Sequence, residues 1–194
     1  MINNKTKWNK AIQAIMKFKR TFFRIDKEEK TSNKLCGLLG EYYVLRELNK
    51  RMAEPKHTGG QGSYDISLNN DEIKIEVKTS SLKNEGIYSK GISFWGWVVK
   101  WKTKKRINYD FLVAVALDKN WKPKFYIFTL KEVQNSDVKI SRYPSIEKAI
   151  QLFENKVAYK KARKEKKGIR KNRCIVEINS NPRKFLNRWD KIKW

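Results

Sequence analysis

The stretch SYDISLNNDEIKIEVKTSS, residues 63 to 81, decides the fold of this chain. On both sides of the Asn-Asn-Asp sequence at positions 69 to 71, aliphatic residues alternate with polar ones, as they do in half-buried strands. Because successive side chains on a strand point to opposite faces, we expect a β-hairpin with one aliphatic face. Its other face carries Asp65, Glu76 and Lys78.

The register of this hairpin brings two acids together. If Leu68 pairs with Ile73 across a four-residue turn, the antiparallel register places Asp65 opposite Glu76. Facing residues have Cβ atoms about 4.5–5.5 Å apart, and like charges there repel. A divalent cation bridging the two carboxylates would relieve this repulsion, so the sequence predicts a metal site here.

A third acid lies in a predicted helix over residues 34 to 51, KLCGLLGEYYVLRELNKR. At about 100° per residue, Leu38, Val44, Leu45 and Leu48 all fall within about 60° of Glu41. An ionised carboxylate in such a stripe is costly unless something satisfies it. Two alternatives follow: Glu41 faces the hairpin acids as a functional group, or it lies at the rim of the stripe and reaches water or one lysine.

The composition points to a polyanionic partner. The chain has 194 residues, enough for one domain with a real core, and a formal net charge of +25 at pH 7. This excess favours nucleic acid first and an anionic membrane surface second. No apolar run approaches the roughly 18–20 residues of a spanning helix, and no signal-peptide pattern opens the chain. With Cys36 and Cys174 far apart and expected to be reduced, a cytoplasmic protein is predicted.

Several segments leave alternatives open. A basic amphipathic helix at residues 8 to 24 either packs on the domain or contacts DNA. Near residues 94 to 101, the tryptophans Trp95, Trp97 and Trp101 share a strand face, as core or as a surface for DNA or a partner. His57, the only histidine, lies in the glycine-rich loop of residues 52 to 62 and is expected to be an ordinary surface residue.

The C-terminal part predicts further strands and helices. Apolar runs predict strands over residues 110 to 117, which should be central and buried, and 124 to 130. Helical spacing from Ser145 to Val157, with Ser145 as N-cap, predicts a helix that runs into a basic segment. A strand over 174 to 178 and a terminal helix over 182 to 194 complete the chain.

This order of elements predicts a mixed α/β sheet flanked by helices. The whole chain, 1–194, is expected to form one domain with its core at about 34–130, the N-terminal basic helix 8–24 and a C-terminal basic helical extension at about 145–194. The residues predicted to contact DNA are Lys74, Lys100, Lys102, Lys104, Lys105, Arg106, Lys160, Lys161, Arg163 and Lys164.

Asp65, followed after ten residues by Glu76-Val77-Lys78 and preceded by a helix carrying Glu41, resembles the PD-(D/E)xK nuclease superfamily. The resemblance is carried by GEYYVLREL around Glu41, GSYDISL around Asp65 and IKIEVKTSS around Glu76 and Lys78. With the strands DFLVAVAL and KFYIFTL it spans about residues 34 to 130. The proline of the family's name is missing, and Tyr64 precedes the aspartate.

The resemblance implies a restriction-endonuclease-like fold and a Mg²⁺-dependent DNA endonuclease. Its catalytic residues would be Glu41, Asp65, Glu76 and Lys78. One or two Mg²⁺ ions would be held by Asp65, Glu76 and the backbone carbonyl of Val77, with Glu41 as an additional contact. Lys78 would orient or help deprotonate the attacking water.

The partner implied is double-stranded DNA and not a membrane. More specifically, the chain resembles the small catalytic subunit of a heterodimeric type IIS restriction endonuclease, in which a larger subunit recognises the sequence. The alternatives are a Holliday-junction resolvase, which would act as a homodimer, and a basic nucleic-acid-binding protein without catalytic activity.

Overall fold

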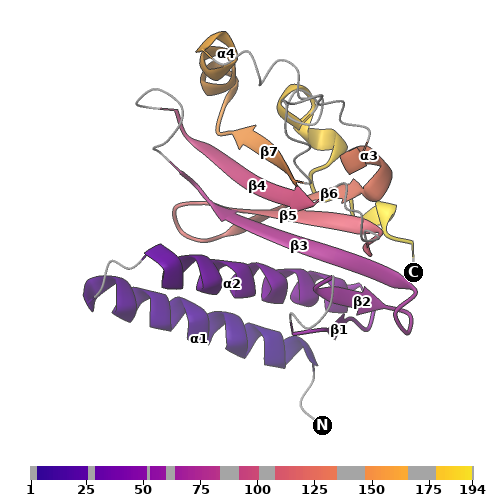
Figure 1. Cartoon of the computed structure of the whole chain (residues 1–194). Coiled ribbons are helices and arrows are strands. Elements are labelled where there is room, and N and C mark those ends of the chain that lie inside the picture. The colour runs from indigo at the N-terminus through magenta and orange to yellow at the C-terminus, as the bar shows by residue number, and fades with distance from the viewer. Residues whose placement is uncertain are drawn as a thin grey trace.

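The computed structural model describes residues 4–25, 29–51, 53–59, 64–83, 92–100, 108–134, 147–165 and 178–193. These residues form two long helices, a five-stranded sheet and a two-stranded sheet, stacked in layers (Figure 1). The two helices cover one face of the five-stranded sheet, and the two-stranded sheet covers the other. The predicted fold class, a mixed central sheet flanked by helices, is confirmed.

The five-stranded sheet has the order β1-β2-β3-β5-β6. Its strands are β1 (Lys56–His57), β2 (Ile66–Leu68), β3 (Ile73–Ser81), β5 (Phe111–Leu117) and β6 (Pro123–Thr129). Only the β3–β5 pair is parallel, so the chain must cross over between these strands. Residues 112–117 are all buried, which confirms the predicted central strand.

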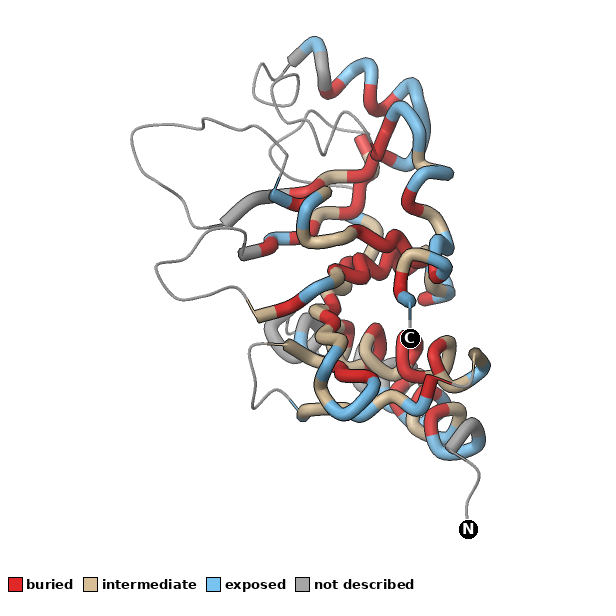
Figure 2. The backbone as a smooth tube through the Cα atoms, turned by 90° about the vertical axis from the view of Figure 1, so that its right-hand side faces the viewer, coloured by how far each residue is buried: buried red, intermediate tan, exposed pale blue. Residues whose placement is uncertain are grey.

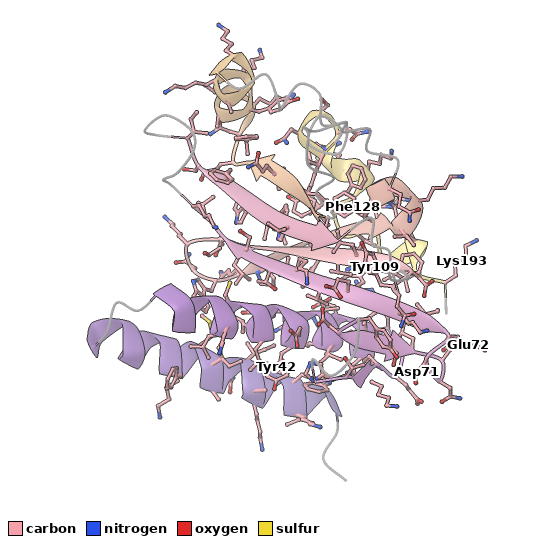
Figure 3. All side chains as sticks on the ribbon, in the orientation of Figure 1. Tyr42, Asp71, Glu72, Tyr109, Phe128 and Lys193 are labelled. Carbon is pink, nitrogen blue, oxygen red and sulfur yellow. The ribbon has the colours of Figure 1, made fainter. Side chains whose placement is uncertain are left out.

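The hairpin formed by β2 and β3 has the predicted register. Leu68 pairs with Ile73, and Ile66 pairs with Ile75. The turn residues at positions 69 to 71 all have positive φ (50°, 52° and 71°), a conformation that Asn and Asp tolerate better than other non-glycine residues. Figure 3 shows Asp71 and Glu72 at the end of this hairpin.

Helices α1 (Asn4–Ile25) and α2 (Glu29–Lys50) form one core with the aliphatic face of the hairpin. Leu45 and Leu48 of α2 and Ile66 and Ile75 of the hairpin are fully buried there. Each such side chain contributes about 1.5–3 kcal/mol through its removal from water. The buried face of α1 contributes Trp8, Ile12 and Ile15. The alternative in which the N-terminal basic helix packs on the domain is therefore confirmed.

The contact between α2 and β3 is close enough to require a glycine. A Cβ atom at Gly40 would lie 1.8 Å from Thr79 Oγ1. At Gly37, one turn earlier on the same helix, a Cβ atom would meet nothing within 4 Å. Gly40 therefore sets how near the helix lies to the sheet, and the next residue along α2 is Glu41.

The second sheet consists of β4 (Phe94–Lys100) and β7 (Glu147–Phe153), paired antiparallel. Trp95 and Trp97 are buried against the five-stranded sheet, and their indole N–H groups donate to Leu117 O at 2.8 Å and Val115 O at 3.1 Å. These two tryptophans are core residues, so the alternative of a surface for DNA or a partner is wrong for them. Trp101 lies outside the described residues.

The helix predicted from Ser145 to Val157 is wrong over most of its length. Residues 147–153 are strand β7, and the helix α4 (Lys156–Glu165) begins only after Asn155. Ile150 and Phe153 fit a helical spacing, whereas Ile150 and Leu152 fit the alternation of a strand, and pairing with β4 along seven residues decides for the strand. Asn155 is the N-cap, because its Oδ1 accepts the N–H of Ala158 at 2.8 Å. Ser145 lies outside the described residues.

The predicted terminal helix over 182 to 194 is also wrong. Two short 3₁₀ turns, η1 (Pro182–Lys184) and η2 (Trp189–Lys191), are separated by Asn187 with a φ of +54°. Leu186 forms an isolated antiparallel β-bridge with Tyr126 of β6. The segment therefore runs along β6 and does not form a helix. The sequence predicts a basic helical extension over 145–194. In the described part of that range, the basic helix is α4. Of the predicted strand 174–178, only Ile178 is described, in a short helical turn.

Figure 2 shows buried residues concentrated along the strands and between the layers, with exposed residues along the outer helices. The short helix α3 (Leu130–Gln134) follows β6 directly and is held by Lys191, whose Nζ donates to Glu132 Oε2 at 2.8 Å. Among the helices described, none is both long and apolar enough to cross a membrane.

Candidate active site

Asp65 lies where β2 begins, beside β3. Its backbone N–H donates to Ile75 O at 3.0 Å, and its side-chain Oδ2 accepts the N–H of Val77 at 2.7 Å. The paired register starts one residue later, with Ile66 opposite Ile75. The Asp65 carboxylate therefore takes the place of a backbone acceptor and is held next to Glu76.

Glu76 and Lys78 lie on the same face of β3, as predicted. The Lys78 ammonium forms a short ion pair with Glu76 Oε1, with side-chain exposures of 36% for Lys78 and 17% for Glu76. Lys78 and the Val77 N–H thus each offset part of the repulsion between the two acids.

Glu41 lies on α2, with 21% of its side chain exposed, and accepts a hydrogen bond from His57 Nε2 at 2.7 Å. Burial raises the pKa of the Glu41 carboxyl above its ordinary value, and the hydrogen bond from His57 acts in the opposite direction. The charge of Asp65 raises this pKa further, whereas that of Lys78 lowers it. Glu41 is therefore within electrostatic reach of the hairpin residues.

The structure thus places Asp65, Glu76 and Lys78 side by side, and Glu41 lies within electrostatic reach of Asp65 and Lys78. Glu41 comes from α2, Asp65 from the start of β2, and Glu76 and Lys78 from β3. Two neighbouring carboxylates suit Mg²⁺, which takes one or two protein carboxylates and keeps several waters. Within the described ranges, no three His, Cys, Asp or Glu side chains come close enough to hold a single metal ion. The predicted ligand set stays a prediction.

His57 is the member of this site that sequence reasoning missed. Only 19% of its side chain is exposed, and it lies on β1, so the expectation of an ordinary surface residue is wrong. The ring of Tyr42 meets the imidazole edge-on, with a centroid separation of 5.9 Å. One signal was available: a buried Glu41 requires a partner, and the loop leading into the hairpin holds the chain's only histidine.

The predicted DNA-contacting residues whose side chains the structure describes lie in two separate places. The Lys74 ammonium donates to Asn108 Oδ1 at 3.2 Å and lies over the ring of Tyr64. Lys160, Lys161 and Lys164 are exposed on α4, which lies beyond the β4–β7 sheet from α1 and α2 (Figure 1). The side chains of Lys100 and Arg163 lie outside the described part, as do Lys102, Lys104, Lys105 and Arg106 entirely.

No protein-family model matches this chain, and no curated protein matches it. Among solved structures, the bacterial homing endonuclease I-Ssp6803I is similar at 16% sequence identity and a TM-score of 0.43. The similarity covers 82% of this chain and 90% of that one. This TM-score is too low for the likeness to establish the fold or the activity of the chain.

Proposed function

We propose that this protein is a metal-dependent DNA endonuclease that hydrolyses phosphodiester bonds. The observation that carries the proposal is the adjacency of Asp65, Glu76 and Lys78 on the β2–β3 hairpin, with Glu41 of α2 within electrostatic reach of Asp65 and Lys78. Two adjacent carboxylates with a lysine on the same strand face form the set of groups that such hydrolysis needs.

Each residue has a distinct role in this proposal. Asp65, Glu76 and the carbonyl of Val77 would hold Mg²⁺. An additional contact from Glu41 would require its carboxylate to move toward them, because no three acids of the described residues meet at one ion. When bound, the ion neutralises phosphate charge and polarises a water molecule. Lys78 orients the attacking water and offsets charge that develops on the phosphate. Its ion pair with Glu76 keeps the ammonium beside the carboxylates.

The substrate proposed is double-stranded DNA. The net charge of +25 favours a polyanion, and the exposed lysines of α4 add a cationic surface. The finer proposal is that the chain is the cleavage subunit of a type IIS restriction endonuclease and cuts one strand beside a larger recognition subunit. In that case the isolated chain is silent on plasmid DNA and gains activity when the partner is added.

The decisive experiment incubates supercoiled plasmid with purified protein and Mg²⁺, alone and with any larger recognition subunit that a neighbouring gene is found to encode. Nicking or linearisation is expected, with loss of at least about 100-fold in Asp65→Asn and Lys78→Ala. The asparagine amide oxygen could still accept the Val77 N–H, so the first substitution tests the charge and not the fold. Lys124→Ala, at an exposed position of β6, is the control. Cleavage that survives both substitutions, or that persists in EDTA, overturns the proposal.

A further inference from the structure

We infer that His57 is a positioning residue, which ties the Glu41 carboxylate of α2 to the chain segment that carries Asp65. This inference rests on the proposed nuclease function and adds a residue to its site. It stands on three features: the contact with Glu41, the anchoring of β1 and the aromatic side chains that hold the imidazole.

The contact joins strand β1 to helix α2 at the carboxylate itself. His57 Nε2 donates to Glu41 Oε2 at 2.7 Å, and both side chains are about four-fifths buried, with exposures of 19% and 21%. Such a partly buried charge-assisted hydrogen bond is short and directional. A glutamate has three rotatable side-chain bonds, and this contact selects one arrangement of them.

The backbone of His57 is anchored to the Asp65 segment. His57 pairs with Ile66 across the β1–β2 ladder. The next residue, Thr58, donates its N–H to Asp65 O at 3.0 Å and its hydroxyl to Tyr64 O at 2.7 Å. The imidazole therefore spans from the strand pair that holds Asp65 to the helix that holds Glu41. A displacement of either acid would have to break this link.

Aromatic side chains fix the orientation of the imidazole. Tyr42 contacts the ring edge-on, at an interplanar angle of 66°, and Trp8 of α1 lies against Tyr42 with centroids 5.4 Å apart. Tyr42 is itself a residue of the helix pair, on α2 (Figure 3). The row Trp8, Tyr42, His57 and Glu41 thus leads from the N-terminal helix to the site. It gives α1 a role in holding Glu41 besides covering the core.

The contact can be tested without any activity, because His57 is the only histidine in the chain. A long-range proton–nitrogen NMR spectrum contains one imidazole pattern, in which a proton on Nε2 is expected. Glu41→Ala should shift the Nε2 resonance. Glu47→Ala should leave it unchanged, because Glu47 lies on the same helix but pairs with Lys50 and Arg51. If Glu41→Ala leaves the Nε2 resonance of His57 unchanged, the inference is overturned.

The role of the contact is tested by two substitutions at position 57. His57→Phe keeps an aromatic ring against Tyr42 but removes the donor, and we expect kcat to fall about 10- to 100-fold with little change in KM, as for other groups that orient a ligand residue. His57→Gln retains an N–H at similar reach and should restore kcat to within a few-fold of the wild type. A purely structural role would not produce rescue by Gln together with a loss confined to kcat.

The outcomes separate this inference from the function on which it rests. If the wild type cleaves DNA and His57→Phe has the same kcat, the positioning role is overturned while the nuclease function stands. The same conclusion follows if His57→Gln is as impaired as His57→Phe at equal thermal stability. If the wild type does not cleave DNA with Mg²⁺ and its partner, the proposed function fails, and the positioning role fails with it.

Discussion

At the scale of single residues, Glu41 and Glu47 offer a contrast on one helix. Burial raises the pKa of Glu41 and is only partly opposed by its hydrogen bond with His57. Burial alone would raise the pKa of Glu47 too, but the hydrogen bonds and charges of its basic neighbours lower it. At neutral pH the ionised Glu41 carboxylate therefore destabilises the folded state, and the ionised Glu47 carboxylate stabilises it.

This contrast predicts opposite effects for the same substitution. A raised folded-state pKa means that stability present at acidic pH is lost as pH rises through that pKa. Glu41→Gln should therefore raise the urea midpoint at pH 7 while abolishing cleavage, and its advantage should vanish at acidic pH. For Glu47 the folded-state pKa is lowered, so Glu47→Gln should lower the midpoint at pH 7. Equal shifts in the same direction would contradict the prediction.

Glu41 was predicted from the sequence as a candidate site residue, but its hydrogen-bond partner His57 was not. The apolar stripe on α2 shows that Glu41 needs a partner, but the partner comes from a two-residue strand. Such a short strand has no periodicity of its own, and it forms only because β2 pairs with it. His57 could not be distinguished from a loop histidine without this pairing.

At the scale of elements, the packing of α2 on β3 depends on Gly40. We predict that Gly40→Ala destabilises the protein by about 1–3 kcal/mol, because its Cβ would overlap Thr79. Gly37→Ala, with open space around it, should be neutral or stabilise by up to about 1 kcal/mol through helix propensity. Urea unfolding of both variants measures these values.

The Gly40 variant should also affect the site. Since Glu41 follows Gly40 directly, moving the helix away from β3 moves the carboxylate away from Asp65. Cleavage by Gly40→Ala should therefore fall even at temperatures where the variant is fully folded, whereas Gly37→Ala should cleave like the wild type. A stable and fully active Gly40→Ala would contradict the close packing described.

The elements differ in how far the sequence determines them. The hairpin of β2 and β3 was predictable to its register, because alternation, turn residues and pairing are all local. Strand β7 was not, because Ile150 and Phe153 fit a helical spacing as well as Ile150 and Leu152 fit a strand, and its partner β4 lies far away in the chain. The terminal 3₁₀ turns depend in the same way on Tyr126 of β6, which no local pattern reveals.

At the scale of the whole molecule, the net charge of +25 should dominate the proposed binding of nucleic acid. Removing one lysine–phosphate contact should reduce the slope of log K against log salt by about 0.9 for duplex DNA. We predict that replacing Lys160, Lys161 and Lys164 of α4 with Gln lowers this slope. The matched control replaces three exposed lysines near β6: Lys119, Lys122 and Lys124.

Fluorescence anisotropy with a labelled duplex at several salt concentrations measures both slopes. The control removes the same charge, so an equal fall in both variants would mean that net charge alone is responsible. A slope that changes only with the α4 lysines would place DNA on that side of the molecule.

The two-stranded sheet also has a consequence for how the chain is made. Trp97 is paired with Ile150, so β4 leaves the ribosome long before its partner strand exists. The helix pair and the β2–β3 hairpin are already synthesised by then, and the contacts within each of them are local. During this interval the edge of β4 that later pairs with β7 is unpaired, a condition that favours association between nascent chains. Slow synthesis between β4 and β7 would prolong this interval. A chaperone that binds β4 during it would reduce association between nascent chains.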